Sequence, residues 1–191
     1  MNQTVNYQLN QWEKADRIQM EDFNADNAKI DAALASIKEL LPIVHLQTIT
    51  TTAAATKLDI DLSGFDWDTY TYALIRIDGK MSSSSGSFYV RMNGYSGEYD
   101  YQYSSGGSNT QSDTYAGYCS LSYSNSKNIP LLLVSNRGTY PDVSIRTIGA
   151  LARYHGMLKR EVALSTLSLV GSSSSYTISS GTKIDIYGIK L

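Results

Sequence analysis

The chain has 191 residues, with 16 lysines and arginines against 18 aspartates and glutamates, and a net charge of −2. This balance argues against a general nucleic-acid binder or a protein of anionic membrane surfaces, because both show a basic excess. A single cysteine, Cys119, excludes a disulfide framework within one chain, and two histidines, His45 and His155, argue against a multi-histidine metal site. We expect no cofactor, no metal and no nucleic-acid partner.

The opening residues 1–12 are polar and contain no apolar core of a secretion signal. The longest apolar runs, residues 40–44 and 129–134, are far shorter than the roughly 20 residues that span a bilayer. The sequence therefore predicts no membrane insertion and a protein made in the cytoplasm.

Residues 1–42 differ from the rest of the chain and predict a helix that runs from about Asp16 to Pro42, which lacks the N–H that a continuing helix needs. The apolar positions follow a heptad, with Leu34 and Leu41 widening the stripe. Positions a and d are Phe23, Ile30, Ala33, Ile37 and Leu40.

Two interpretations of this stripe are open. The helix either folds onto its own domain or forms a short coiled coil between identical chains. We favour the coiled coil, because a lone terminal helix of this composition needs a partner for its apolar face. The β-branched a positions are compatible with a trimer.

From residue 43 to residue 191 the apolar period changes from 3.6 to 2, which is typical of half-buried antiparallel strands. Alternation is clear at residues 57–62, 72–77, 88–93 and 183–187, and strands are also expected at 44–49 and 162–169. Residues 129–134 read as a strand covered on both faces, and residues 143–154 as a strand with a bulge or bend near Gly149. The predicted fold is mainly β: a helical neck (residues 1–42), then a jelly-roll-like antiparallel β-sandwich head of eight to ten strands (residues 43–191).

Catalytic motifs are absent from the sequence. It contains no G-x-S-x-G and no phosphate-binding glycine loop, and Cys119 in a predicted strand reads as a buried thiol. Asp59 and Asp61 begin like a calcium loop, but the twelfth position is Tyr70 instead of glutamate. We therefore expect that the protein is not an enzyme.

Residues 94–126 have the composition of a recognition surface, with 7 tyrosines, 9 serines and 5 glycines among 33 residues. Tyrosine rings stack on sugar faces, and carboxylates and amides hydrogen-bond to hydroxyls. Tyr99, Tyr101 and Tyr103 share one face of a predicted strand, and the alternative is that this is the inward face of the strand. The candidate ligand-binding residues are Tyr99, Asp100, Tyr101, Tyr103, Asn109, Tyr115 and Tyr118.

Two segments resemble tail proteins of phages and prophages of Gram-positive bacteria. The first comprises Asn6-Tyr7-Gln8-Leu9-Asn10-Gln11-Trp12, Asp16-Arg17 and residues 22–34, and the second is the terminal strand at residues 181–191. The second resembles the last strand of receptor-binding or baseplate head domains. Together they cover about 40 residues, and the stretch from 44 to 180 resembles nothing that we can name.

The resemblance implies a homotrimeric receptor-binding component of the virion tail. Its partners would be further copies of itself, other tail or baseplate proteins and a host surface glycan. Tyr7, Leu9 and Trp12 would dock the N-terminal segment. A purely structural baseplate or decoration protein is the alternative, and a hydrolase of surface polysaccharide is the third.

Overall fold

The computed structural model describes residues 2–17, 19–81, 86–104, 114–121, 129–136, 138, 140–148 and 153–191. The chain divides into two compact units, Met1–Pro42 and Ile43–Leu191, and each is described by itself.

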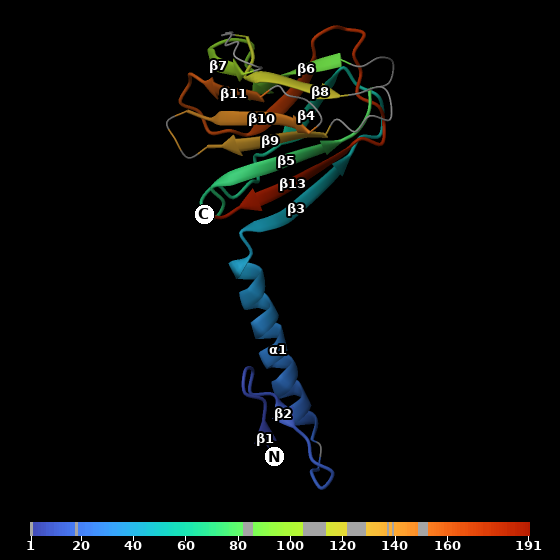
Figure 1. Ribbon diagram of the computed structural model, residues 1–191, viewed down its shortest axis with the longest axis vertical. Helices are drawn as coiled ribbons and strands as arrows, with labels where there is room; N and C mark the ends of the chain where they lie inside the picture. Colours follow the sequence, from blue (N-terminus) through green and yellow to red (C-terminus); the bar gives the residue numbers. More distant parts are fainter. Residues whose placement is uncertain are drawn as a thin grey trace. The chain divides into compact units, whose positions relative to one another are not determined.

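The N-terminal unit is a hairpin followed by one helix (Figure 1). Strand β1 (Asn2–Gln3) pairs antiparallel with β2 (Asn10–Gln11), and helix α1 spans Met20–Leu40. The helix begins four residues later than predicted, because Asp16 accepts a hydrogen bond from the Glu13 amide at 2.9 Å and closes a turn there. It ends before Pro42, as the sequence predicts.

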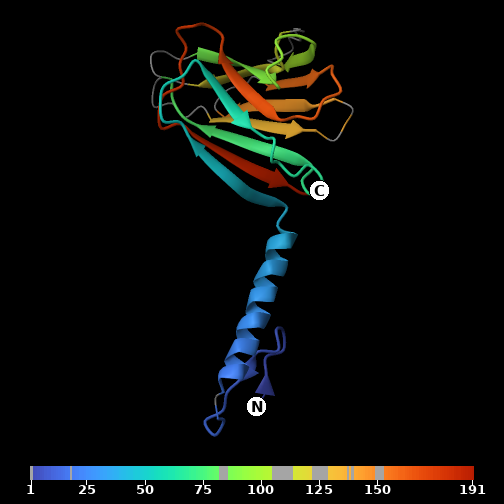
Figure 2. The same cartoon turned by 180° about the vertical axis from the view of Figure 1, so that it is seen from behind.

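The second unit consists of two antiparallel sheets. The large sheet has seven strands and the small sheet has four. The large sheet runs in the order β3 (Ile43–Thr50), β13 (Lys183–Ile189), β5 (Tyr72–Asp78), β9 (Ile129–Ser135), β10 (Asp142–Ile148), β11 (Arg153–Leu158) and β7 (Tyr99–Ser104). The small sheet runs in the order β4 (Lys57–Asp61), β12 (Thr166–Gly171), β6 (Gly86–Met92) and β8 (Gly117–Leu121). Figure 2 shows the teal β4 and the orange β12 passing in front of the large sheet, so that the sheets form two layers.

The core lies between these layers, and the period of two decides which side chains enter it. In β5, Ala73, Ile75 and Ile77 are fully buried, whereas Leu74 and Arg76 between them are partly exposed. The same alternation holds along β6 and β13. The mainly β, antiparallel class predicted from the sequence is therefore confirmed.

Two local predictions are wrong. Residues 143–154 are not one strand with a bulge or bend but belong to β10 and β11, which pair with Ile145 opposite Tyr154. The inward parity changes because the chain reverses; Gly149 itself lies outside the described residues. Strand β9 is covered on one face only, since Leu131 and Leu133 remain partly exposed on the outer face.

Gly156 of β11 sets how closely the two sheets approach at one place. A Cβ at this position would overlap the backbone carbonyl of Ala116, the residue before β8. Only glycine allows this backbone-to-backbone contact.

We expect Gly156→Ala to lower the free energy of unfolding by about 1–3 kcal/mol, because the rigid backbone of residue 116 must move. Gly64→Ala is the matched control, since no atom lies within 4 Å of its added Cβ. Urea denaturation of both variants measures the difference. Equal stability of the two variants would contradict the close approach.

Candidate functional site

Strand β7 carries the first part of the tyrosine-rich segment and splits it between two faces. Tyr99, Tyr101 and Tyr103 point inward, whereas Asp100 and Gln102 point to the outer face. The alternation is the one that the sequence predicts. The tyrosines therefore face the small sheet.

Tyr99 lies in the hydrophobic core and not at the surface. Its ring is fully buried, and its hydroxyl accepts a 2.7 Å hydrogen bond from the Met92 amide and lies 3.1 Å from the Tyr95 carbonyl oxygen. Burial raises the pKa of Tyr99 to about 12. Tyr99 thus fixes the turn between β6 and β7, and its ring is out of reach of a ligand at the surface.

Six tyrosines from both sheets form one connected group of rings, which we call the tyrosine cluster. Ring centroids lie 4.4 Å apart for Tyr89 and Tyr115, 4.6 Å for Tyr115 and Tyr118, and 4.8 Å for Tyr103 and Tyr154. These separations are those of favourable aromatic pairs. The members are Tyr89, Tyr101, Tyr103, Tyr115, Tyr118 and Tyr154.

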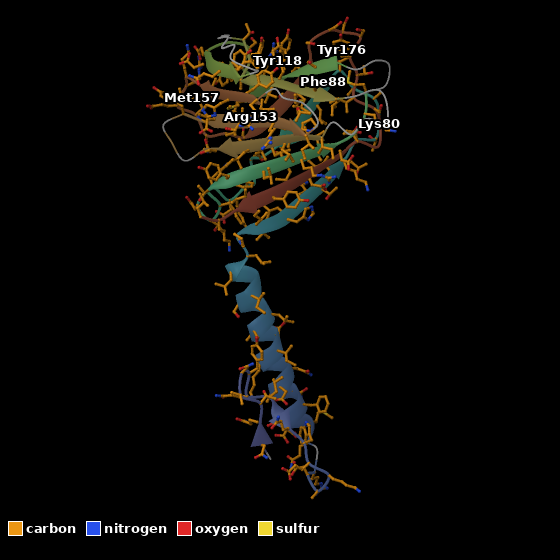
Figure 3. The ribbon with its side chains drawn as sticks, in the orientation of Figure 1. Lys80, Phe88, Tyr118, Arg153, Met157 and Tyr176 are labelled. Carbon is orange, nitrogen blue, oxygen red and sulfur yellow. The ribbon has the colours of Figure 1, made fainter. Side chains whose placement is uncertain are left out.

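The cluster lies beside β8, an edge strand of the small sheet that contacts β10 and β11 of the large sheet. Figure 3 labels Tyr118 on this strand. Gly117 lets Tyr154 approach, because a Cβ there would meet Tyr154 Cβ at 2.8 Å and Ile145 Cδ1 at 2.9 Å. The backbone of Gly117 also has a φ of 146°, which favours glycine.

The cluster presents neutral hydroxyl groups. The hydroxyls of Tyr115 and Tyr118 lie 2.6 Å apart, and one donates to the other. Burial raises the pKa of Tyr154 to about 12, and burial together with the neighbouring phenols also raises the pKa of Tyr118. Tyr118 and Tyr154 therefore stay protonated at neutral pH, and the cluster offers hydroxyl groups and ring faces to a ligand.

The other candidates fall in different places. Tyr101 is only 5% exposed, whereas Tyr103, Tyr115 and Tyr118 are half-buried and supply the accessible part of the cluster. Asp100 lies on the opposite face of β7, where its carboxylate is 3.3 Å from the Lys159 ammonium. Asn109 lies outside the described residues.

Sequence reasoning missed Tyr89 and Tyr154. Both belong to the cluster, but they come from β6 and β11, outside residues 94–126. Only the pairing of distant strands brings them there, so no local signal could have identified them.

The predicted docking residues have different surroundings within the N-terminal unit. Trp12 stacks on Phe23, with ring centroids 6.4 Å apart, and the Asn10 amide donates to the Asp26 carboxylate at 2.9 Å. The hairpin is thereby fixed along the first turns of α1. Tyr7 is 54% exposed, whereas Leu9 is half-buried.

The predicted neck residues form an exposed apolar stripe on the single chain. Ile30, Ile37 and Leu40 are 42, 48 and 82% exposed, and Phe23 is 54% exposed despite its contact with Trp12. Ala33 is half-buried. The stripe therefore leaves apolar side chains exposed to water, and this exposure is unfavourable in free energy.

Comparisons with known proteins do not assign the chain to a family. No family model matches the chain, and no curated protein matches it. Among solved structures, full-length tailspike protein 2 from Escherichia coli O157:H7 bacteriophage CAB120 aligns with 13% identity and a TM-score of 0.29. The alignment covers 78% of this chain, which spans about a quarter (26%) of the tailspike. A TM-score this low does not indicate a shared fold.

Two further features are absent from the described part of the chain. It contains no group of three or more histidine, cysteine, aspartate or glutamate side chains placed to hold a metal ion. None of its helices is both long and apolar enough to cross a membrane.

We expect the folded protein to ionise fewer tyrosines than the unfolded protein between pH 10 and pH 12, since burial raises the pKa of Tyr99 and Tyr154 from 10.0 to about 12. Folding favours the neutral phenols, so their contribution to stability is complete below pH 10 and is lost as the pH rises through about 12. The near-ultraviolet absorbance of tyrosinate, followed with and without denaturant, measures this. Tyr154→Phe should remove one late-titrating phenol, and coincident folded and unfolded curves would contradict the burial.

Proposed function

We propose that this protein is a non-enzymatic component of a phage or prophage tail, in which three copies join through α1 and the heads attach to a glycan on the host cell. The observation that carries the proposal is the exposed apolar stripe of α1. A helix in a unit of its own, with Ile30, Ile37 and Leu40 all at least 42% exposed, is stabilised when further copies cover it.

The N-terminal segment supports a tail location. The residues that resemble tail proteins of phages of Gram-positive bacteria form the hairpin and the first turns of α1, and Trp12 and Asn10 hold the two together. Tyr7 projects from this hairpin and is exposed. In the proposal this compact end docks on other tail or baseplate proteins.

The head supports glycan binding through the accessible part of the tyrosine cluster. Tyr103, Tyr115 and Tyr118 combine ring faces with neutral hydroxyls, which suit the C–H faces and hydroxyls of a sugar. Three heads on one coiled coil would strengthen weak single sites, because linked sites raise the effective concentration. The proposed head is jelly-roll-like, with eleven strands in the described residues.

A purely structural baseplate or decoration protein is the second candidate. The mutual packing of the six tyrosines favours it, since rings that stabilise one another need no ligand. Glycan binding separates the two proposals.

The neck is tested by Ile37→Asp. Three carboxylates around one axis would repel each other without compensation, so we expect the trimer to dissociate to monomers. Ala35→Asp is the matched control, because residue 35 occupies heptad position f, away from the stripe. Light scattering gives the mass, and a wild-type protein of monomer mass at micromolar concentration would contradict the proposal.

Glycan attachment is tested with the full-length protein on an array of bacterial surface glycans. We expect Tyr103→Ala and Tyr115→Ala each to weaken binding by about five- to ten-fold, through lost ring contacts. Tyr140→Ala is the control, because Tyr140 is 38% exposed and is not a member of the cluster. Unchanged binding by both cluster variants would exclude this surface as the attachment site, and binding to no glycan would favour the purely structural candidate.

A further inference from the structure

The outer face of the large sheet has a hollow that the tyrosine cluster does not explain. It has a volume of about 490 Å³ over β5, β9, β10, β11 and β7, which is within the usual range of small-ligand sites, and Tyr103 and Tyr154 of the cluster are part of its lining. Its floor is apolar: Leu74 lies opposite Leu133 across the β5–β9 pair, and Leu131 follows on β9. These three leucines alternate with core residues and are only half-buried.

Polar side chains from three strands border this floor. His155 of β11 lies opposite Ser144 of β10, and its Nδ1 is 3.0 Å from the serine hydroxyl. On its other side His155 lies opposite Gln102 of β7. An imidazole, a hydroxyl and an amide therefore line up in one row, and each can exchange hydrogen bonds with a ligand hydroxyl.

The next row contains two arginines. Arg146 of β10 and Arg153 of β11 lie directly opposite each other, and both are exposed (Figure 3 labels Arg153). Like charges in this position destabilise a sheet. Within the described residues, neither arginine has an ion pair. The carboxylates of this face have other partners: Asp185 and Asp78 contact Arg76, Asp100 contacts Lys159, and Asp142 accepts a hydrogen bond from Ser135.

We propose that the hollow binds an acidic saccharide unit. Its carboxylate or phosphate lies between Arg146 and Arg153, and an apolar ring face lies on Leu131 and Leu133. The anion removes the repulsion between the two guanidinium groups and accepts charge-assisted hydrogen bonds from both. The inference rests on the proposed function, because it names the class of glycan that the head selects.

An uncharged occupant fits this surface less well. A purely apolar partner would desolvate two guanidinium groups and offer them no acceptor, which is costly. A second copy docking through the same face would bring its own pair of arginines, and the carboxylates of that face already have partners. A ligand with an anionic group and an apolar face provides acceptors for the two arginines and packs on the leucine floor.

The test is calorimetric titration of the full-length protein with two matched pairs of probes. Oligogalacturonate is compared with its methyl ester, and pentamannose phosphate with pentamannose; the pairs separate a carboxylate source from a phosphate source. We expect at least one acidic probe to bind about ten-fold or more tightly than its neutral partner, and binding to weaken as salt is added. No preference in either pair, up to millimolar probe, would overturn the inference.

The site is located by Arg146→Ser and Arg153→Ser. Each should lower the affinity for the acidic probe about ten-fold or more, whereas Lys183→Ser removes the same charge from β13 on this sheet and should leave it unchanged. Equal effects of all three substitutions would overturn the inference, since they would indicate general charge attraction. Loss of trimer mass in the arginine variants would also overturn it, by showing that the hollow is covered by a second copy.

The same samples distinguish this inference from the proposed function. A monomer that binds the acidic probe through the two arginines leaves the inference standing and contradicts the trimeric attachment protein. A trimer that binds host glycans but shows no preference for acidic probes supports the proposed function and overturns the inference.

Discussion

The head depends on covering a wide sheet with a narrow one. Adjacent strands lie about 4.8 Å apart, so four strands are about 14 Å narrower than seven and leave part of the inner face of the large sheet without a strand above it. Aromatic side chains complete the cover. On one side the Tyr70 ring lies against Gly188 of β13, where an added Cβ would strike it. On the other side the tyrosine cluster fills the space beside β8.

The first role of the tyrosine cluster is thus to cover the part of the large sheet that the small sheet leaves open. Tyrosine suits this position because its ring removes apolar surface from water while its hydroxyl stays hydrated or bonded to a neighbour. The Tyr115–Tyr118 hydroxyl pair shows the second property. The half-buried tyrosines are the outer part of this covering layer, and burial raises the pKa of two of them, Tyr118 and Tyr154.

Local alternation was enough to predict β4, β5, β6 and β13 to within one or two residues, because one face of each strand is buried. It could not predict the order of strands in the sheets, which depends on contacts between residues far apart in the chain. The tyrosine segment shows both sides of this limit. The alternation of side chains along a strand predicts that Tyr99, Tyr101 and Tyr103 share one face. Tyr89 and Tyr154 join the cluster only because β6 pairs with β8 and β11 pairs with β7.

Alternation also explains how β11 can serve two different surfaces. Tyr154 points inward to the uncharged cluster, and the neighbouring Arg153 and His155 point outward to the cationic hollow. Gly156 fixes the strand at its contact with Ala116, and Tyr103 and Tyr154 of the cluster also line the hollow. Since cross-strand neighbours on one face interact far more strongly than residues on opposite faces, a charge change at Arg153 alters the hollow without repacking the ring beside it.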